Sequence, residues 1–343
     1  MKSYYHSLPE LDALERTIEV LSPHADIQTL AKINTRGKEF PLYSISLGSK
    51  DPKAPVLGLF AGVHGLERIG TRIVIAYLQT LAELMSWDET VSNLLKKSRL
   101  VLVPLINPGG MYLKARANPN GVDLMRNSPI EAESTSKWFL AAGHRISPVL
   151  PWYRGEEKAA MELESKAVCD FVEKSIYPSR MALTVDFHSG FGKIDRFWFP
   201  YAKTKAPMPD ISKVYALKNL LDRTYPNHVY CVEPQSKQYR THGDLWDYLY
   251  DNHLKDRGEK LFLPFTLELG SWLWVKKNPS QLFSLLGPFN PQQRHRYQRI
   301  LRRHVTLIDF LWRAILSPRS WVEQDESTVM ELKSKAMDLW FND

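Results

Sequence analysis

The sequence has few cysteines and no long apolar run. Its two cysteines, Cys169 and Cys231, lie far apart and in no C-x-x-C pattern. They provide neither a disulfide framework nor a thiolate zinc site, and they are compatible with a reducing compartment. No run of about 18 apolar residues is present to span a bilayer, and the opening MKSYYHSLPELDALERT lacks the apolar core of a secretory signal. We therefore expect a cytoplasmic protein with no membrane partner.

Internal repeats and low-complexity segments are absent as well. The hydrophobic fraction of 44% and the charged fraction of 24% are typical of a globular protein, and 343 residues can form one large α/β domain or two smaller ones. The formal net charge is +7, with basic residues scattered except between Arg294 and Arg303. Such a modest excess does not predict a nucleic-acid partner, and oligomeric state is not predictable.

Alternating apolar runs and helical periodicities predict an α/β fold. Ser7 and Glu10 form a capping-box pattern that predicts an opening helix, and the β-rich runs 27–33 and 40–47 predict a hairpin. Further strands are predicted at 55–63, 100–105, 181–187 and 262–268, and further helices at 68–86, 158–174, 210–223, 243–254 and 291–316. This alternation is the signature of a mostly parallel sheet with helices on both sides.

Two segments lack a clear period. Residues 106–157 are rich in Pro, Gly and Asn, and a loop of that length inside a compact domain is usually functional. Residues 317–343 are predicted to be a polar tail with a weak final helix. The chain is therefore expected to form a single domain over residues 1–316, followed by this tail.

Three potential metal ligands follow two of the predicted strands. His64 and Glu67 directly follow strand 55–63, and open α/β sheets bind ligands outside the carboxyl ends of their strands. Taken alone, an H-x-x-E pair arises by chance on many surfaces. His188 follows strand 181–187, and a single histidine there would more often be a hydrogen-bonded core residue. Together, two histidines and a glutamate can hold zinc and leave its fourth position for water.

A further carboxylate stands at the end of strand 262–268. Glu268, in TLELG, is separate from the three potential ligands. A zinc hydrolase needs a carboxylate that does not ligate the metal, because a base must accept the proton of the attacking water. The alternative is a glutamate that is salt-bridged at the end of its strand.

The ordered series of motifs resembles the zinc carboxypeptidase family typified by carboxypeptidase A. The matching segments are AGVHGLE, PLINPGGMYLKARANPNGVDLMRN, DFHSG, GDLWDYLYD and TLELG. The resemblance covers most of the chain. It implies a carboxypeptidase-like catalytic domain over residues 1–316, built as a single α/β domain. In that fold a mixed, mostly parallel, twisted sheet of about eight strands is flanked by helices on both faces.

The resemblance also implies a catalytic mechanism. One Zn²⁺ per chain would be held by His64, Glu67 and His188. Glu268 would be the general base that accepts a proton while zinc-activated water attacks the carbonyl of a peptide or a peptide-like amide. Asp123 matches a carboxylate that accepts the second N–H of His64 and fixes its ring. An aspartate that only makes a local backbone bond in an Asn-Gly turn is the alternative.

Further residues match positions that contact the substrate in this family. Arg116 lies ten residues before Arg126, the spacing that compact members show between the oxyanion-stabilising and carboxylate-binding arginines. Lys114 is an alternative candidate for the oxyanion-stabilising role. Arg126 is expected to bind substrate together with Asn127 and with Tyr239, which matches a mobile tyrosine that closes over the substrate. Three other tyrosines remain alternatives for that closing role: Tyr230, Tyr248 and Tyr250.

The chain departs from the family pattern at two positions. Met125 stands where the family usually has the asparagine that precedes the carboxylate-binding arginine, which weakens the expected recognition of a free C-terminus. Leu66 stands between two predicted ligands where some members have arginine. The floor of the specificity pocket is expected from one of three consecutive residues: Leu245, Trp246 or Asp247.

Three functions are compatible with these residues. The first is a zinc metallocarboxypeptidase that removes C-terminal residues. The second is a hydrolase of small N-acyl amino acids, of the aspartoacylase or succinylglutamate desuccinylase kind. Met125 is compatible with this function because it weakens the expected recognition of a free C-terminus. The third is an inactive binding module that docks its basic helix on an acidic partner.

Overall fold

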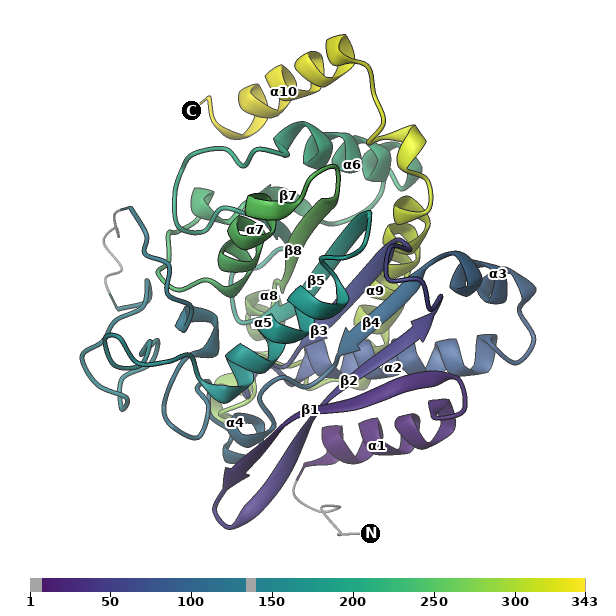
Figure 1. Cartoon of the computed structure of the whole chain (residues 1–343). Helices are drawn as coiled ribbons and strands as arrows, with labels where there is room; N and C mark the ends of the chain where they lie inside the picture. Colours follow the sequence, from purple (N-terminus) through teal and green to yellow (C-terminus); the bar gives the residue numbers. More distant parts are fainter. Residues whose placement is uncertain (1–7, 134–139, 343) are drawn as a thin grey trace.

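An eight-stranded sheet forms the centre of the molecule (Figure 1). The computed structural model describes residues 8–133 and 140–342. The strands follow the order β1-β2-β4-β3-β5-β8-β6-β7 across the sheet. Their bounds are β1 (Ala25–Thr35), β2 (Lys38–Gly48), β3 (Val56–Ala61), β4 (Arg99–Val103), β5 (Met181–Ser189), β6 (Arg196–Phe199), β7 (Cys231–Pro234) and β8 (Leu261–Leu269).

The sheet is mixed, with a parallel centre. Strands β4, β3, β5 and β8 run parallel to one another, and β6 runs parallel to β7. The β1–β2 hairpin, the β2–β4 pair and the β6–β8 pair are antiparallel. Every residue of β3, β5 and β8 is buried, as expected for strands covered on both faces. The predicted fold class is confirmed.

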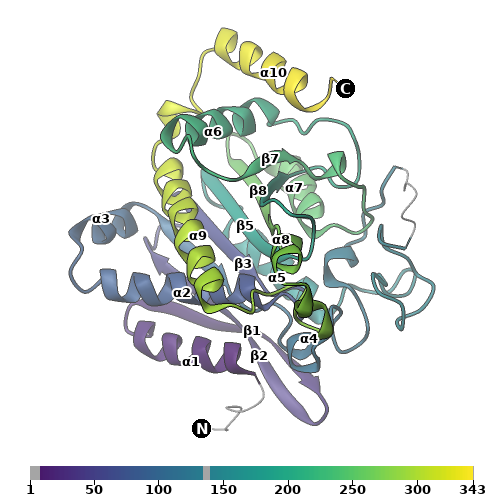
Figure 2. The ribbon, with the colours of Figure 1, turned by 180° about the vertical axis from the view of Figure 1, so that it is seen from behind.

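Helices cover both faces of this sheet. The first figure shows α5 and α7 in front of it, and the reverse view shows α2 and α9 across the other face (Figure 2). The helix bounds are α1 (Pro9–Leu21), α2 (Arg68–Leu84), α3 (Glu89–Lys97), α4 (Pro108–Leu113), α5 (Leu163–Ser175), α6 (Ile211–Thr224), α7 (Leu245–Asp256), α8 (Trp272–Lys277), α9 (Arg294–Ile315) and α10 (Glu326–Trp340). No helix of the described ranges is long and apolar enough to cross a membrane.

The predicted capping box at the amino end is not what holds α1. Ser7 lies outside the described residues, and Glu10 does not turn back to cap the helix. Its buried carboxylate instead accepts hydrogen bonds from Arg68, at 2.9 Å, and from Arg72, at 2.6 Å. The capping-box pattern therefore predicted the helix correctly, but Glu10 joins α1 to α2 instead of capping α1.

Several short elements were not predicted. Strands β6 and β7 have four residues each, and α4 and α8 have six, so none is long enough to show a period. Helix α3 was missed although Asp88 caps it, accepting the N–H groups of Thr90 and Val91. Helix α5 begins at Leu163, five residues later than predicted, because Lys158 has a left-handed backbone with φ of 65°.

The segment after residue 316 contains a docked helix. Trp340 of α10 is buried, donates a hydrogen bond to the Val232 carbonyl at 2.9 Å, and meets Phe199 edge-on with ring centroids 4.7 Å apart. This segment is therefore more than the polar tail expected from its composition. The domain boundary at residue 316 stays a prediction.

Candidate metal centre and catalytic cavity

The three predicted metal ligands meet at the carboxyl ends of β3 and β5. His64 and Glu67 lie in the turn between β3 and α2, and His188 lies in β5. This turn is tight, because Gly62 has φ of 71° and a Cβ on Gly65 would lie 2.2 Å from the Gly110 backbone. The two small residues let the chain reverse over the sheet edge and place both side chains beside β5.

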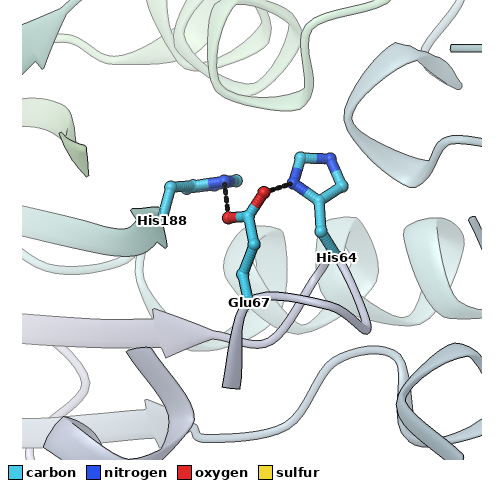
Figure 3. Close-up of side chains that lie close together, drawn as sticks. All are labelled: His64, Glu67 and His188. Carbon is cyan, nitrogen blue, oxygen red and sulfur yellow. Dashed lines mark hydrogen bonds and ion pairs between the residues drawn. The ribbon is translucent and has the colours of Figure 1, made fainter. Parts of the chain in front are cut away.

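The three side chains converge on a common point (Figure 3). His64 Nδ1 lies 2.9 Å from one oxygen of Glu67, and His188 Nδ1 lies 3.3 Å from the other. One potential ligand atom of each residue lies within 4.8 Å of the others, and all three side chains are buried. Despite its burial, the two imidazoles hold the pKa of Glu67 well below its usual range, so the carboxylate is ionised.

The donor set fits a zinc ion. Both histidines direct Nδ1 to the shared point, and both use Nε2 to contact a carboxylate. His64 Nε2 lies 3.1 Å from Asp123, and His188 Nε2 lies 2.9 Å from Asp186. A carboxylate behind a ligating imidazole fixes its tautomer and raises its basicity, which is the usual arrangement around protein zinc. Two nitrogens and one carboxylate leave the fourth tetrahedral position of zinc open.

Asp123 contacts both His64 and the local backbone. Its Oδ1 accepts the Met125 N–H at 3.1 Å as well as facing His64, and its Oδ2 accepts Arg116 Nε at 2.8 Å. The local backbone bond and the contact with His64 were alternatives from the sequence, yet both are present. Although burial opposes ionisation, Arg116 and His64 hold the pKa of Asp123 well below its usual range.

Asp186 was missed by the sequence analysis. It lies two residues before His188 on β5, and residues i and i+2 of a strand face the same side. Its Oδ2 also accepts Trp246 Nε1 at 3.0 Å, so the carboxylate links α7 to the second histidine. An aspartate inside a fully buried strand needs a polar partner, and this was the signal that could have found it.

Replacing Asp186 with asparagine is expected to weaken zinc binding about 10- to 100-fold. The amide keeps the shape and an acceptor for Trp246 but loses the charge that supports His188. Competition with a chelator would give the affinity of each purified variant. The control is Asp170→Asn on the surface of α5, which should bind zinc like the parent; an unchanged affinity in the Asp186 variant would contradict a positioning role.

Arg116 lies beside the triad. Besides its bond to Asp123, its Nη1 lies 3.3 Å from Glu67 Oε1. Burial opposes the charge, but the two carboxylates outweigh it and raise the pKa of Arg116. The competing Lys114 is exposed and does not line the cavity described next.

Glu268 lies at the end of β8, the strand next to β5. It pairs with His188 in the parallel register, is 6% exposed, and accepts the Phe191 N–H at 3.0 Å. Burial, and secondly the charge of Glu67, raises the pKa of Glu268 to about 8. No basic side chain is bonded to it among the described residues, which argues against the alternative of a salt-bridged strand end.

A cavity of about 660 Å³ brings most of the predicted site together. It is lined by the three predicted ligands and by Glu268, Arg116, Arg126, Tyr239 and Met125. Tyr239 packs against Phe191 and Trp198, with ring centroids 5.4 and 5.9 Å apart. The alternative tyrosines Tyr230 and Tyr250 are instead bonded to His304 and Asp210, outside the cavity.

Arg126 presents a poorly bonded guanidinium to this cavity. It is 4% exposed, and its hydrogen bonds to the carbonyls of Met125 and Ala141 are long, at 3.4 and 3.5 Å. The Tyr239 hydroxyl also contacts this guanidinium. Its Nε has no hydrogen-bond partner. A buried cation with unmet donors is prepared to bind an anionic group.

Two groups of residues expected in the substrate pocket lie outside this cavity. Asn127 does not line this cavity. Its amide donates to the Arg154 carbonyl at 3.0 Å and accepts the Glu162 N–H at 2.6 Å, so it braces a loop beside a separate cavity of about 710 Å³. The expected floor residues 245–247 do not line the cavity either, because they begin α7 and are buried in the core; the residue just before them, Asp244, does line it.

Comparisons with known proteins agree with this geometry. A family model described as zinc carboxypeptidase matches residues 19–271. Mast cell carboxypeptidase A of Rattus norvegicus is 25% identical over 273 residues, which are 72% of this chain and only 63% of that relative's length.

Solved structures share the fold at lower identity. Bovine thrombin-activatable fibrinolysis inhibitor, solved with a tick carboxypeptidase inhibitor, superposes with a TM-score of 0.65 at 19% identity, covering 91% of this chain and 97% of that one. Carboxypeptidase A of Helicoverpa armigera gives 0.59 at 17% identity, covering 98% and 75%. The family match spans most of the chain, and the chain belongs to the zinc carboxypeptidase family.

Proposed function

We propose that the chain is a zinc-dependent metallocarboxypeptidase that removes the C-terminal residue of peptides. The observation that supports this most is one cavity that joins the three predicted ligands to Glu268 and to the unmet donors of Arg126. The triad would bind the metal, Glu268 would move protons, and Arg126 would bind the terminal carboxylate. A carboxylate is the anion whose geometry a guanidinium matches with two parallel hydrogen bonds.

Glu268 and Arg116 have different roles in the proposed reaction. Zinc, when bound, would supply a Lewis acid that polarises the substrate carbonyl and acidifies water. Glu268, held by the Phe191 N–H, accepts the proton of the attacking water and passes it to the leaving amine. Burial raises the pKa of Glu268, which makes its carboxylate a better proton acceptor. Arg116 donates hydrogen bonds to the oxygen that becomes negative as the carbonyl is attacked.

Asp244 favours a basic terminal residue. This residue lines the cavity and is 2% exposed, while its Oδ1 caps α7 by accepting the N–H groups of Trp246 and Asp247. Burial raises the pKa of Asp244, and a lysine or arginine side chain of the substrate would favour its ionised form and pair with it in a site with little water. We propose that basic C-terminal residues are preferred over acidic ones.

A second function has the support of Met125. This residue is 4% exposed and lines the cavity, so an apolar thioether takes the place of an amide that would hydrogen-bond a terminal carboxylate. A hydrolase of small N-acyl amino acids would tolerate that change. Its substrates, however, would leave much of a cavity of about 660 Å³ unfilled.

These functions can be separated by incubating the protein with a pool of peptides and, in parallel, with N-acyl amino acids, and identifying the products by mass spectrometry. We expect single residues to leave from free C-termini, basic ones fastest, with N-acyl amino acids hydrolysed far more slowly. Preferred cleavage of N-acyl amino acids would establish the second function. Cleavage of neither class by zinc-loaded protein would contradict both and leave the binding module.

A further inference from the structure

An exposed apolar and basic surface lies on α8 and the segment that follows it. The 3-10 helix η3 (Pro279–Phe283) packs next to α8. Large apolar side chains are exposed on both elements and just beyond them, and Phe283 is 96% exposed. We call this the docking surface; it consists of Trp272, Leu273, Leu282, Phe283 and Leu285 together with Lys276 and Lys277.

The apolar and basic side chains share one side of α8. Trp272 and Lys276 are four residues apart, as are Leu273 and Lys277, and residues at this spacing are neighbours on a helix surface. All four are exposed. Each exposed apolar side chain on α8 therefore has a lysine one turn away.

The backbone that presents these side chains is firmly attached. Gln281 is buried and donates to the Gly287 carbonyl at 2.8 Å, which closes the loop containing the exposed leucines and Phe283. Asn290 then joins this loop to the metal-binding turn, donating to the Leu66 carbonyl at 2.8 Å and accepting the Ile69 N–H at 3.0 Å. A fixed loop that holds large apolar side chains in water is typical of a binding surface.

The segment that contains this surface is rich in basic residues. Seven lysines and arginines and no acidic residue occur between Glu268 and Asp309, and one of the seven, Arg303, is paired with Asp195. The start of α9 belongs to the same region, because Arg296 donates to the Trp274 carbonyl at 3.0 Å. Arg294 and Arg299 beside it are exposed. An anionic partner is therefore favoured.

We propose that the docking surface binds anionic lipid bilayers, inserting its apolar side chains among the acyl chains while the lysines contact the headgroups. Tryptophan, phenylalanine and leucine next to lysine are the composition of interfacial membrane-binding segments. Protein interfaces, by contrast, are depleted in lysine. The expectation of no membrane partner concerns spanning segments, and peripheral docking needs none. The proposal does not depend on the proposed hydrolysis.

Vesicle sedimentation tests this proposal. The chain should pellet with vesicles of phosphatidylcholine mixed with phosphatidylserine, much less with phosphatidylcholine alone, and less again as salt is raised. The double variant Phe283→Ser, Leu285→Ser should lower the partition coefficient at least about tenfold. The variant Lys276→Gln, Lys277→Gln should lower it by a similar factor.

Matched controls come from surfaces elsewhere on the chain. Met330→Ser on α10 removes another exposed apolar side chain, and Lys96→Gln with Lys97→Gln removes an adjacent pair of exposed lysines at the end of α3. Both should bind vesicles like the parent. All these positions are exposed, so thermal melting should confirm that the variants fold. Absence of binding to anionic vesicles overturns the proposal, and so does an equal loss of vesicle binding in the control variants. The proposal also fails if the chain forms a dimer that Phe283→Ser dissociates while vesicle binding is unchanged.

Discussion

Replacing Glu268 with glutamine is expected to slow peptide hydrolysis by about 100- to 10,000-fold while zinc still binds at about one ion per chain. The amide keeps the size of the side chain and an acceptor for the Phe191 N–H, which lies 3.0 Å away. It cannot accept the proton of water or return one to the leaving amine. Steady-state kinetics and metal analysis of the same preparation would measure both quantities.

The matched control for this variant is Glu164→Gln. Glu164 is also a buried glutamate, 2% exposed, but it lies on α5 near Asn118 and outside the cavity. The Glu164→Gln variant should hydrolyse peptides at a rate within about twofold of the parent rate. If the Glu268 variant hydrolyses as fast as the parent, the base lies elsewhere. If it loses zinc together with activity, Glu268 acts on the metal and not on the proton.

Replacing Arg126 with glutamine is expected to lower kcat/KM for free C-termini by about 30- to 1,000-fold, since an anion in a buried site loses its charged partner. Its bonds to protein carbonyls are long, at 3.4 and 3.5 Å, and its other contact is with Tyr239 in the cavity, so little native bonding outside the site is lost. Peptides with amidated C-termini should be cleaved slowly by the parent and equally slowly by the variant. Paired substrates of identical sequence give this comparison directly.

Arg145→Gln is the control for Arg126. Arg145 lies in the same long loop but donates to the Gly155 and Glu156 carbonyls, away from the cavity. Its variant should keep the preference for free C-termini. A loss in Arg126→Gln that is equal for free and amidated peptides would mean that this arginine supports the loop and does not bind a carboxylate.

The main site was predictable because its residues follow buried strands. His188 and Glu268 are register partners on adjacent parallel strands, and the turn after β3 lies on the other side of β5. Parallel neighbours end at the same edge of a sheet, so side chains placed after each strand must meet there. Asp186 was equally accessible to this reasoning, because its spacing from His188 puts it on the same face.

The long loop, the docking of α10 and the orientation of α7 depend on tertiary contacts that no local sequence pattern contains. In the long loop after β4, the bond from Asn127 to the Arg154 carbonyl turns Asn127 away from the cavity. The docking of α10 rests on two buried residues, Ala336 and Trp340, in a largely polar segment. In the same way, the orientation of α7 decides that Asp244, and not the three residues after it, reaches the cavity.

Zinc titration of metal-free protein is the most direct test of the central claim, a catalytic zinc held by His64, Glu67 and His188. Hydrolysis of a peptide with a free C-terminus should be undetectable without metal, rise in proportion to added zinc, and saturate at about one ion per chain. His188→Ala should show neither tight binding nor activity. Full activity in metal-free protein, or saturation unaffected in His188→Ala, would contradict the account.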